Sequence, residues 1–394
     1  MRIGIEITQL FFEFQTGLFH YGLNLARGLG RLPRRSSVTL FTSETLSPAR
    51  WQEITEQCRP LPIRVFRNSA RPYRLRLALH ALSRQDALFY VMGHIVRPAS
   101  NRVNAFLVPD LTPLHDRQWH TDATREHWQE QYDLIRKYAD CLITFSEHTK
   151  SDVVEHLDIP AHKIHAIPLA ASERFRPLAR EEVAKELQTI GLQPEAYILS
   201  VGTLEPRKNH VRLIRAFQRL RERGAAGNQK LVLAGPKGWH YDAIFAEIDR
   251  LGLQSHVLHL GHYPRLEVLM NGATVMAYPS LFEGFGLPPL EAMACGTPVL
   301  ASNTSSLPEV VGNAGRLIDP HDEESMANAL AEIIADTALR SQMRVAGLAR
   351  AQEFSWQRTA QSTLDVLERA VNERSSATRI HAWGTRSKAA ALTH

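Results

Sequence analysis

Short apolar runs alternate with stretches of helical periodicity along almost the whole chain. In the first part the apolar runs are rich in Ile, Val, Leu and Phe, residues that favour strands. These runs are RIGIEI (2–7), SVTLFT (37–42), ALFYVM (87–92), NAFLVP (104–109) and CLITFS (141–146). Residues 21–32 and 126–138 have the spacing of amphipathic helices. This alternation predicts βαβ units around a parallel sheet.

The same alternation starts again after a looser, proline-containing segment at about residues 165–195. The second series of predicted strands is AYILSVG (196–202), KLVLAG (230–235), VLHLGH (257–262), TVMAYPS (274–280), PVLAS (298–302) and AGRLID (314–319). The pattern therefore predicts an α/β fold of two doubly wound domains, 1–175 and 190–355, with a cleft between them. A last helix at 356–372 precedes a polar, alanine-rich tail, 373–394, that we expect to be disordered. Ligands of such sheets bind beyond the C-terminal ends of the strands, so the loops there should carry the function.

Length and composition agree with this organisation. A chain of 394 residues exceeds one compact core, and its 44% hydrophobic and 22% charged residues are typical of a globular protein. It contains no run of 18 apolar residues, which argues against a membrane span. Cys58, Cys141 and Cys295 lie far apart and form no metal or disulfide pattern, so we expect a reducing, cytoplasmic setting.

The net charge of +5 is unevenly distributed. The segment from Arg59 to Arg84 contains seven arginines and no acidic residue. One interpretation is contact with anionic lipid headgroups, and hence a peripheral position at the inner face of the membrane, or with a phosphate-bearing acceptor. The other is a solvated helix face whose apolar side points inward. Nucleic acid is not an expected partner, because aromatic residues are not interleaved with the arginines.

A first candidate site follows a predicted strand in the segment AYILSVGTLEPRKNHVRLIRAF (196–217). Gly202 permits close backbone approach after the strand, and Thr203 follows it. Arg207 and Lys208 then come just before a predicted helix. Two cations beside a helix N-terminus form an anion site, for which a diphosphate is a good candidate. A plain pair of surface charges is the other interpretation, but the position after a strand and a glycine favours phosphate.

A second candidate site follows the strand TVMAYPS, where Glu283 and Glu291 bracket a loop with Gly284, Gly286 and two prolines. The prolines suit a helix start, with Glu291 expected in the first turn. Carboxylates accept hydrogen bonds from neighbouring hydroxyls. The pair of glutamates thus fits a ligand with two sugars and a diphosphate between them. Taken singly, Glu283 could be a solvated loop residue and Glu291 a compensation of the helix dipole.

These residues resemble a known family. Glu283, seven intervening residues and Glu291, within FEGFGLPPLEAMACGTPVLAS, closely resemble the signature of the retaining glycosyltransferases of family 4, which have the GT-B fold. VGTLEPRKNHVRLIRAF resembles the phosphate-binding segment of that family, and SSLPEVVGNAGRLIDPHD and FSWQRTA resemble its continuation. The resemblance runs from about Ser146 to Val371. It implies two Rossmann-like domains facing a cleft, with the last helix, near Trp356, crossing back onto the first domain.

The resemblance also implies a role for each matching residue. Arg207 and Lys208 would bind the donor diphosphate, and Glu283 would contact the hydroxyls or the reacting face of the transferred sugar. These three are the expected catalytic residues, while Glu291 would bind the ribose hydroxyls. The other expected donor-binding residues are Gly17, in a segment similar to the glycine loop of the family, and Gly202, Thr203, Gly284, Phe285, Gly286 and Leu287.

The chain departs from the family pattern at one position. The family often has a His-Asp pair after a strand of the first domain, whereas this chain has FLVPDLTPLHDRQWH. Asp110 matches, but Pro109 stands in place of the histidine. His94 or His115 could substitute on the acceptor side, although each could equally be an ordinary surface histidine. We therefore expect an unusual acceptor side or a reduced activity.

The implied reaction moves a hexose from a nucleotide diphosphate sugar to a hydroxyl with retention at the anomeric carbon. The form GTLEPRKN resembles chains of bacterial polysaccharide and O-antigen assembly, which favours mannose from the co-substrate GDP-mannose. The acceptor would be a glycan or a lipid-linked oligosaccharide. We expect no cofactor and no metal, because the sequence shows no Asp-x-Asp pattern or histidine cluster and the two cations can meet the charge of the leaving group.

Other functions fit less well. The sequence lacks a G-x-G-x-x-G after the first strand and a G-x-x-x-x-G-K-[ST] motif, so a nicotinamide dehydrogenase or a P-loop NTPase is not expected. A nucleotide-sugar epimerase on a similar fold would convert the donor without an acceptor. The non-enzyme alternative is a glycosyltransferase-like scaffold that binds a nucleotide sugar or a partner, and Pro109 gives it some support.

Overall fold

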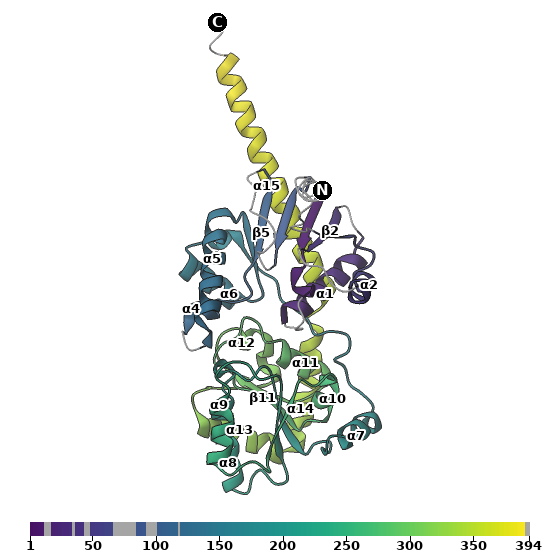
Figure 1. Cartoon of the computed structure of the whole chain (residues 1–394), viewed down its shortest axis with the longest axis vertical. Coiled ribbons are helices and arrows are strands. Elements are labelled where there is room, and N and C mark those ends of the chain that lie inside the picture. The colour runs from purple at the N-terminus through teal and green to yellow at the C-terminus, as the bar shows by residue number, and fades with distance from the viewer. Residues whose placement is uncertain are drawn as a thin grey trace.

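Two parallel sheets organise the computed structural model, each with helices on its faces (Figure 1). The structure describes residues 1–11, 17–33, 36–42, 48–65, 84–91, 101–116 and 119–390. The N-terminal sheet has the order β3-β2-β1-β4-β5-β6-β7. Its strands are β1 (Arg2–Glu6), β2 (Ser37–Thr42), β3 (Ile63–Val65), β4 (Ala87–Tyr90), β5 (Val103–Leu107), β6 (Cys141–Thr144) and β7 (Ile164–Ala166). Its helices are η1 (Thr8–Phe11), α1 (Gly17–Arg31), α2 (Pro48–Gln57), α4 (Thr112–His115), α5 (Asp122–Tyr138), α6 (Glu147–Leu157) and η3 (Ala161–Lys163).

The C-terminal sheet has the order β10-β9-β8-β11-β12-β13, and all its pairs are parallel. Its strands are β8 (Tyr197–Val201), β9 (Lys230–Ala234), β10 (Val257–Gly261), β11 (Val275–Tyr278), β12 (Val299–Ser302) and β13 (Arg316–Ile318). The helices around it are α7 (Arg180–Gln188), η4 (Pro206–Lys208), α8 (His210–Glu222), α9 (Asp242–Arg250), α10 (Leu266–Gly272), α11 (Leu287–Cys295), α12 (Leu307–Val311), η5 (Gly312–Ala314), α13 (Glu323–Ala335) and α14 (Thr337–Gln352).

The predicted fold class is confirmed. All six strands of the second series and five of the N-terminal strands lie in the apolar runs identified above. The central strands are buried on both faces, which is why they read as continuous apolar runs without alternation. The exceptions are β3, which begins inside the arginine-rich segment, and β7, in the looser segment at 165–195; both are only three residues long.

Each sheet has a point where the strand order reverses. In the C-terminal sheet β8 pairs with β9 on one side and with β11 on the other, and in the N-terminal sheet β1 does the same between β2 and β4. The loops that leave neighbouring strands at such a point diverge and open a crevice at the C-terminal ends of the strands. In the C-terminal domain these are the loops after β8 and β11, which contain both candidate motifs.

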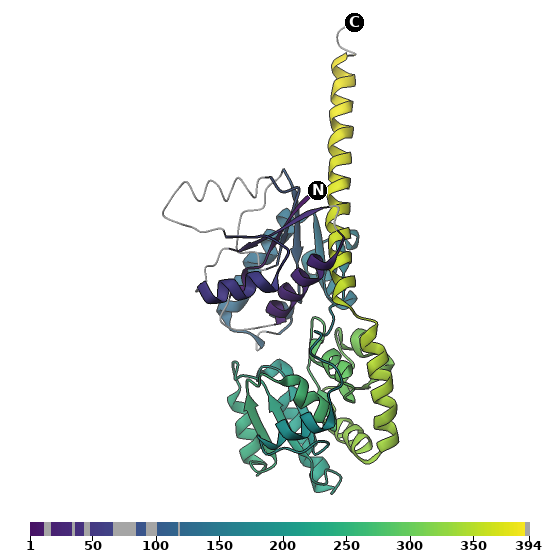
Figure 2. The ribbon, with the colours of Figure 1, turned by 90° about the vertical axis from the view of Figure 1, so that its right-hand side faces the viewer.

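The last helix, α15 (Trp356–Ala390), returns to the N-terminal domain and lies along α1 and β5 (Figures 1 and 2). Gly28 of α1 makes this close crossing possible, since a Cβ there would lie 2.8 Å from both the Trp356 carbonyl oxygen and the Ala360 Cβ. Residues 373–390, for which we expected disorder, continue the helix. They include four alanines and four arginines or lysines, which are good helix formers.

In the described parts of the chain, none of the helices combines the length and the apolar character that a membrane crossing requires. Residues 66–83, which include most of the arginine-rich segment, lie outside the described residues, and so does His94.

Candidate functional site at the switch point of the C-terminal sheet

The loops after β8 and β11 are joined by a buried asparagine. Asn209 follows η4 with a left-handed backbone (φ 61°). Its Nδ2 donates to the carbonyl oxygens of Pro279 (3.0 Å) and Pro320 (2.8 Å). The main chain N–H of Leu281 also donates to the carbonyl oxygen of Arg207 (2.8 Å). These bonds place η4 directly beside the loop that carries Glu283.

Arg207, Lys208 and Glu283, the three predicted catalytic residues, meet at this junction. The Lys208 Nζ lies 2.6 Å from Glu283 Oε1, and the Arg207 Nη1 lies 2.9 Å from Glu283 Oε2. Their side chains are only 14%, 12% and 10% exposed, in the order Arg207, Lys208, Glu283. Glu205 holds the other side of the guanidinium at 2.6 Å, and the Tyr278 hydroxyl accepts from Lys208 Nζ at 2.7 Å. Glu205 and Tyr278 were not predicted from the sequence, although Glu205 lies in the GTLEPRKN segment itself.

The charges in this cluster control one another. Burial opposes the charge of Glu283, but Arg207 and Lys208 outweigh it and lower the pKa of this carboxyl to about 2. Burial also opposes the charge of Arg207, yet the carboxylates of Glu283, Glu205 and Asp110 raise its pKa above the ordinary value. Burial and the neighbouring guanidinium lower the pKa of Lys208, partly offset by Glu283. Glu283 is therefore ionised and serves as the shared counterion of two cations.

Gly284 and Gly286 are required in the loop for different structural reasons. Gly286 has φ 114° and precedes the first residue of α11, Leu287. Gly284 lies against the other domain: a Cβ there would be 2.2 Å from the Pro109 carbonyl oxygen. Ser306, which sequence reasoning also missed, donates to the carbonyl oxygens of Glu283 and Phe285, both at 2.8 Å. The loop is thus fixed from α12 on one side and from the N-terminal domain on the other.

Gly202 and Thr203 lie at the start of the loop after β8. Gly202 has φ 143°, and a Cβ there would lie 3.4 Å from the Lys208 Cε. A larger residue would be strained here and would press on the lysine. Gly17 is the first residue of α1, and a Cβ at this position would meet no atom within 4 Å.

Glu291 lies apart from the charged cluster. Because α11 starts at Leu287, Glu291 is its fifth residue and not in the first turn as expected. It is half-buried, and no hydrogen bond or ion pair to it exists among the described residues. Burial raises its pKa to about 8, with Arg174 acting in the opposite direction. Arg174 also opposes the charge of His20 on α1, whose pKa burial lowers to about 4. Glu291 is therefore a carboxyl group available to a ligand.

The N-terminal domain reaches this site through the loop after β5. Asp110 accepts hydrogen bonds from the Thr112 N–H (2.9 Å) and hydroxyl (2.6 Å). His115 lies on α4, bonded to Asp152 at 3.0 Å, with its ring 4.3 Å from that of Phe282. It therefore borders the loop but does not join the charged cluster.

A histidine that sequence reasoning did not name lies closer to the charges. Burial lowers the pKa of His120, and the charges of Asp110, Arg207 and Glu205 all act on it. Its Nε2 lies 2.9 Å from the Thr112 hydroxyl oxygen. No spacing in the sequence distinguishes His120 from the other histidines, because its neighbours come from both domains.

The two domains are in direct contact around the site. The hydroxyls of Ser146 and Thr149 donate to the Gly284 carbonyl oxygen at 2.9 and 3.3 Å. The Glu309 carboxylate accepts the first N–H groups of α6, from Glu147 (2.8 Å) and His148 (2.7 Å). The Trp239 indole also donates to the Trp119 carbonyl oxygen at 2.6 Å, and the Trp119 ring lies 6.1 Å from that of Phe282.

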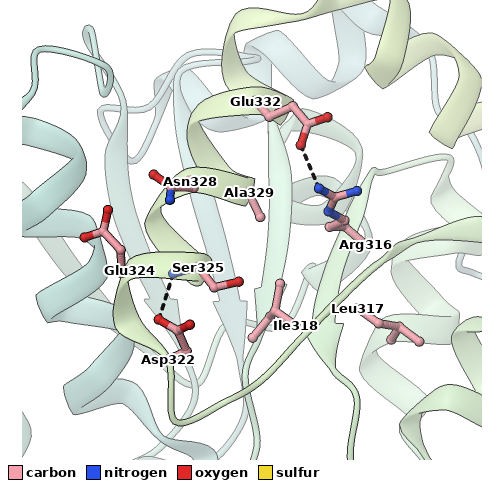
Figure 3. A pocket seen from close by; sticks show the side chains of 9 residues that line it. All are labelled: Arg316, Leu317, Ile318, Asp322, Glu324, Ser325, Asn328, Ala329 and Glu332. Carbon is pink, nitrogen blue, oxygen red and sulfur yellow. Dashed lines mark hydrogen bonds and ion pairs between the residues drawn. The ribbon is translucent and has the colours of Figure 1, made fainter.

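A separate hollow of about 400 Å³ lies at the outer edge of the C-terminal sheet, between β13 and α13 (Figure 3). Asp322 accepts from the Ser325 N–H at 2.9 Å, and Arg316 pairs with Glu332 at 3.0 Å. Its charged side chains therefore already have partners, including Glu324, which pairs with Arg223, and the hollow shares no residue with the switch-point site.

Two doubly wound domains that enclose a site at the switch point define the GT-B fold of glycosyltransferases. Residues 184–350 match the family described as Glycosyl transferases group 1, so the family resemblance noted in the sequence is confirmed and this region is a glycosyl transferase domain. The crystal structure of Anabaena HepE in complex with UDP and glucose has the same fold, with a TM-score of 0.73 and 20% identity over 93% of this chain and 99% of that one.

Two relatives from Escherichia coli share more of the sequence. The chain is 36% identical over 229 residues to O-antigen chain mannosyltransferase B, an alignment that covers 58% of this chain and 60% of that protein. It is 30% identical over 264 residues to the serotype-specific mannosyltransferase WbdA, covering 65% of this chain and 32% of that protein. The alignments thus span between a third and three fifths of these relatives.

Proposed function

We propose that the protein transfers a hexose, with retention, from a nucleotide diphosphate sugar to a hydroxyl of a glycan or lipid-linked acceptor in cell-surface polysaccharide synthesis. The observation that carries the proposal is the junction at which Glu283 is shared by Arg207 and Lys208 at the ends of β8 and β11. The two buried cations suit a diphosphate, and the carboxylate beside them can accept hydrogen bonds from sugar hydroxyls. Together they suit a diphosphate sugar better than a diphosphate or a sugar alone.

In this mechanism the bond between the anomeric carbon and the diphosphate oxygen breaks through an oxocarbenium-like state. The acceptor oxygen forms the new bond on the same face, and its proton passes to the departing phosphate oxygen. Arg207 and Lys208 would meet the charge that develops on the leaving group, so the step needs no metal. Glu283 would hold the hydroxyls of the sugar, and Glu291 would accept hydrogen bonds from the ribose.

The favoured donor is GDP-mannose. Both Escherichia coli relatives are named as mannosyltransferases, and the GTLEPRKN form of the anion-binding segment points the same way. The HepE structure contains UDP and glucose instead, so UDP-glucose is the natural competitor in a test. The acceptor would be reached on the cytoplasmic face of the membrane, with the arginine-rich segment as the membrane contact.

The test is a donor panel. The purified chain would be incubated with GDP-mannose, UDP-glucose and dTDP-glucose in EDTA, and its melting temperature and the release of nucleoside diphosphate would be followed. We expect one donor to raise the melting temperature and to be slowly hydrolysed. Lys208→Ala and Glu283→Gln should strongly reduce both effects, whereas Lys185→Ala, which changes an exposed lysine on α7, should not.

Two alternatives give different results in the same panel. A scaffold that binds the donor would be stabilised but would show no turnover with any acceptor. An epimerase would change the donor sugar with no acceptor present. The membrane contact is tested separately: changing Arg71, Arg74 and Arg76 to Glu should weaken binding to anionic vesicles, and unchanged binding would remove that part of the proposal.

A further inference from the structure

Helix α6 presents a row of potential metal ligands. His148, Asp152 and His156 are spaced four residues apart, which places them on one face of the helix. His115, from α4, lies across this row: its Nε2 is 3.0 Å from Asp152 Oδ2, and its ring is 5.2 Å from that of His156. One donor atom each from His115, Asp152 and His156 lie within 4.8 Å of one another. The sequence did not reveal this cluster, because its fourth member comes from another helix.

The composition of the cluster indicates the kind of ion. Two imidazoles and one carboxylate suit Zn²⁺ and related transition metals, whereas Mg²⁺ and Ca²⁺ prefer oxygen donors alone. We propose that His115, Asp152 and His156 bind a Zn²⁺-class ion. With metal–ligand bonds of about 2.0–2.2 Å, tetrahedral ligands lie roughly 3.3 Å apart, so the side chains need to close by only about 1.5 Å.

His148 is a candidate for a fourth ligand, and it lies outside the set of donor atoms within 4.8 Å of one another. The Nε2 of His148 is enclosed and has no hydrogen-bond partner in the part of the chain that the structure describes. It lies 3.7 Å from Asp152 Oδ2, the same oxygen that His115 contacts. An enclosed ring nitrogen without a partner is costly unless something binds it. Either His148 or a water completes the tetrahedron.

The site borders the sugar-nucleotide crevice without being part of it. The rings of His115 and His148 lie 4.3 and 5.4 Å from that of Phe282, the residue before Glu283. A bound ion would fix α4 and α6 relative to each other and hold this aromatic contact between the domains. Its role is to position the wall of the crevice. The inference rests on the histidine cluster alone and not on the proposed transfer reaction.

The experiment uses the full chain without a histidine tag, first treated with EDTA and dialysed. Zn²⁺ is then titrated in by calorimetry, and Co²⁺ by visible absorption, where tetrahedral coordination gives an intense band. We expect one ion per chain and a metal-dependent rise of the melting temperature. His115→Ala and His156→Ala should weaken binding at least ~10-fold, because each removes a ligand. His162→Ala, an exposed histidine in η3, should bind as the unchanged chain does.

The proposal is overturned if no saturable binding occurs, or if the two ligand variants and the His162→Ala control bind equally. Melting in EDTA separates loss of the site from loss of the fold, since the variants should still unfold cooperatively there and should gain no stability when Zn²⁺ is added. Asp152→Asn is a further variant, which keeps a side chain of the same size and should also lose the cobalt band. Since the metal ions are the only probes, the result does not depend on finding a sugar donor.

Discussion

The two walls of the crevice are built on different principles. The C-terminal wall, residues 202–208 and 278–286, consists of side chains that hold one another through a closed ion cluster. The N-terminal wall, residues 109–116, 119–120 and 146–156, offers backbone carbonyls, hydroxyls and histidines instead. At the first wall Glu283 satisfies two cations at 2.6 and 2.9 Å, while at the second the backbone carbonyl of Pro109 lies against Gly284. A wall of ion pairs is pre-organised for a ligand of fixed charge, whereas the other wall is free to vary with the acceptor.

The largest effect should come from breaking the C-terminal wall. Lys208→Ala removes one of the two cations of Glu283 and the charge that would meet the leaving group. We expect turnover to fall by ~10²–10³-fold, as is usual when one donor to a developing charge is lost. Steady-state kinetics with the donor found in the panel would measure this. A variant with unchanged turnover but a raised KM would mean that Lys208 serves binding only.

The next prediction concerns a substitution that would disturb the contact between the two walls. In Gly284→Ala the new Cβ would be 2.2 Å from the Pro109 carbonyl oxygen, so the loop or the domain contact must shift. We expect the melting temperature to fall by several degrees, corresponding to about 1–3 kcal/mol for an overpacked site. The comparison variant is Ser146→Ala, which forces no overlap but removes a hydrogen bond to the same glycine carbonyl and the cap on the Thr149 N–H at the start of α6, at about 1 kcal/mol. Equal effects of the two variants would show that the close approach to Pro109 is not a constraint.

The third prediction is a pH dependence of stability caused by Glu291, which lies outside the charged cluster. Its pKa is raised to about 8 in the folded chain, so the folded state retains this proton after the unfolded state has lost it near the ordinary value of 4.5. The stability contributed by this group is therefore present at low pH and lost as the pH rises towards 8. Glu291→Gln should melt like the unchanged chain at pH 5 and at a higher temperature at pH 8.5. Parallel melting curves across this range would contradict the raised pKa.

The smallest effect should come from the helix end that joins the walls. Glu309→Gln removes the negative charge that accepts the first N–H groups of α6 but keeps an acceptor oxygen. We expect a loss of about 0.3–1 kcal/mol, reduced further by salt. Melting at low and at 0.5 M salt would detect it. A loss that does not shrink with salt would point to a cause other than the charge.

Much of the C-terminal domain could be predicted because its chemistry is local. The end of a strand, a glycine and two cations follow one another within the segment 201–208. Two consecutive prolines mark the start of the helix after Gly286. What joins these segments could not be predicted, since Asn209 acts through bonds to Pro279 and Pro320, which follow other strands. The two cations could be predicted from the sequence, but their sharing of the single Glu283 carboxylate could not.

The N-terminal wall was harder to predict, for the same reason. The departure at Pro109 was visible, yet the structure shows that its backbone carbonyl oxygen makes the contact with Gly284, a role that most residues could fill. His120 acts near charges of both domains, and its partners are not coded by any spacing. The cluster of His115 with Asp152 and His156 likewise exists only once α4 and α6 are folded together.

The chain passes between the domains twice, before α7 and again before α15, and the two passages are tied together. The Thr359 hydroxyl, in the first turns of α15, donates to the Pro168 carbonyl oxygen at 2.7 Å. Because the two linkers are fastened to each other at this place, they form a single hinge between the domains. If the domains open, we therefore expect them to rotate about this place, and the Trp239–Trp119 bond would have to break while the neighbourhood of Thr359 stays together.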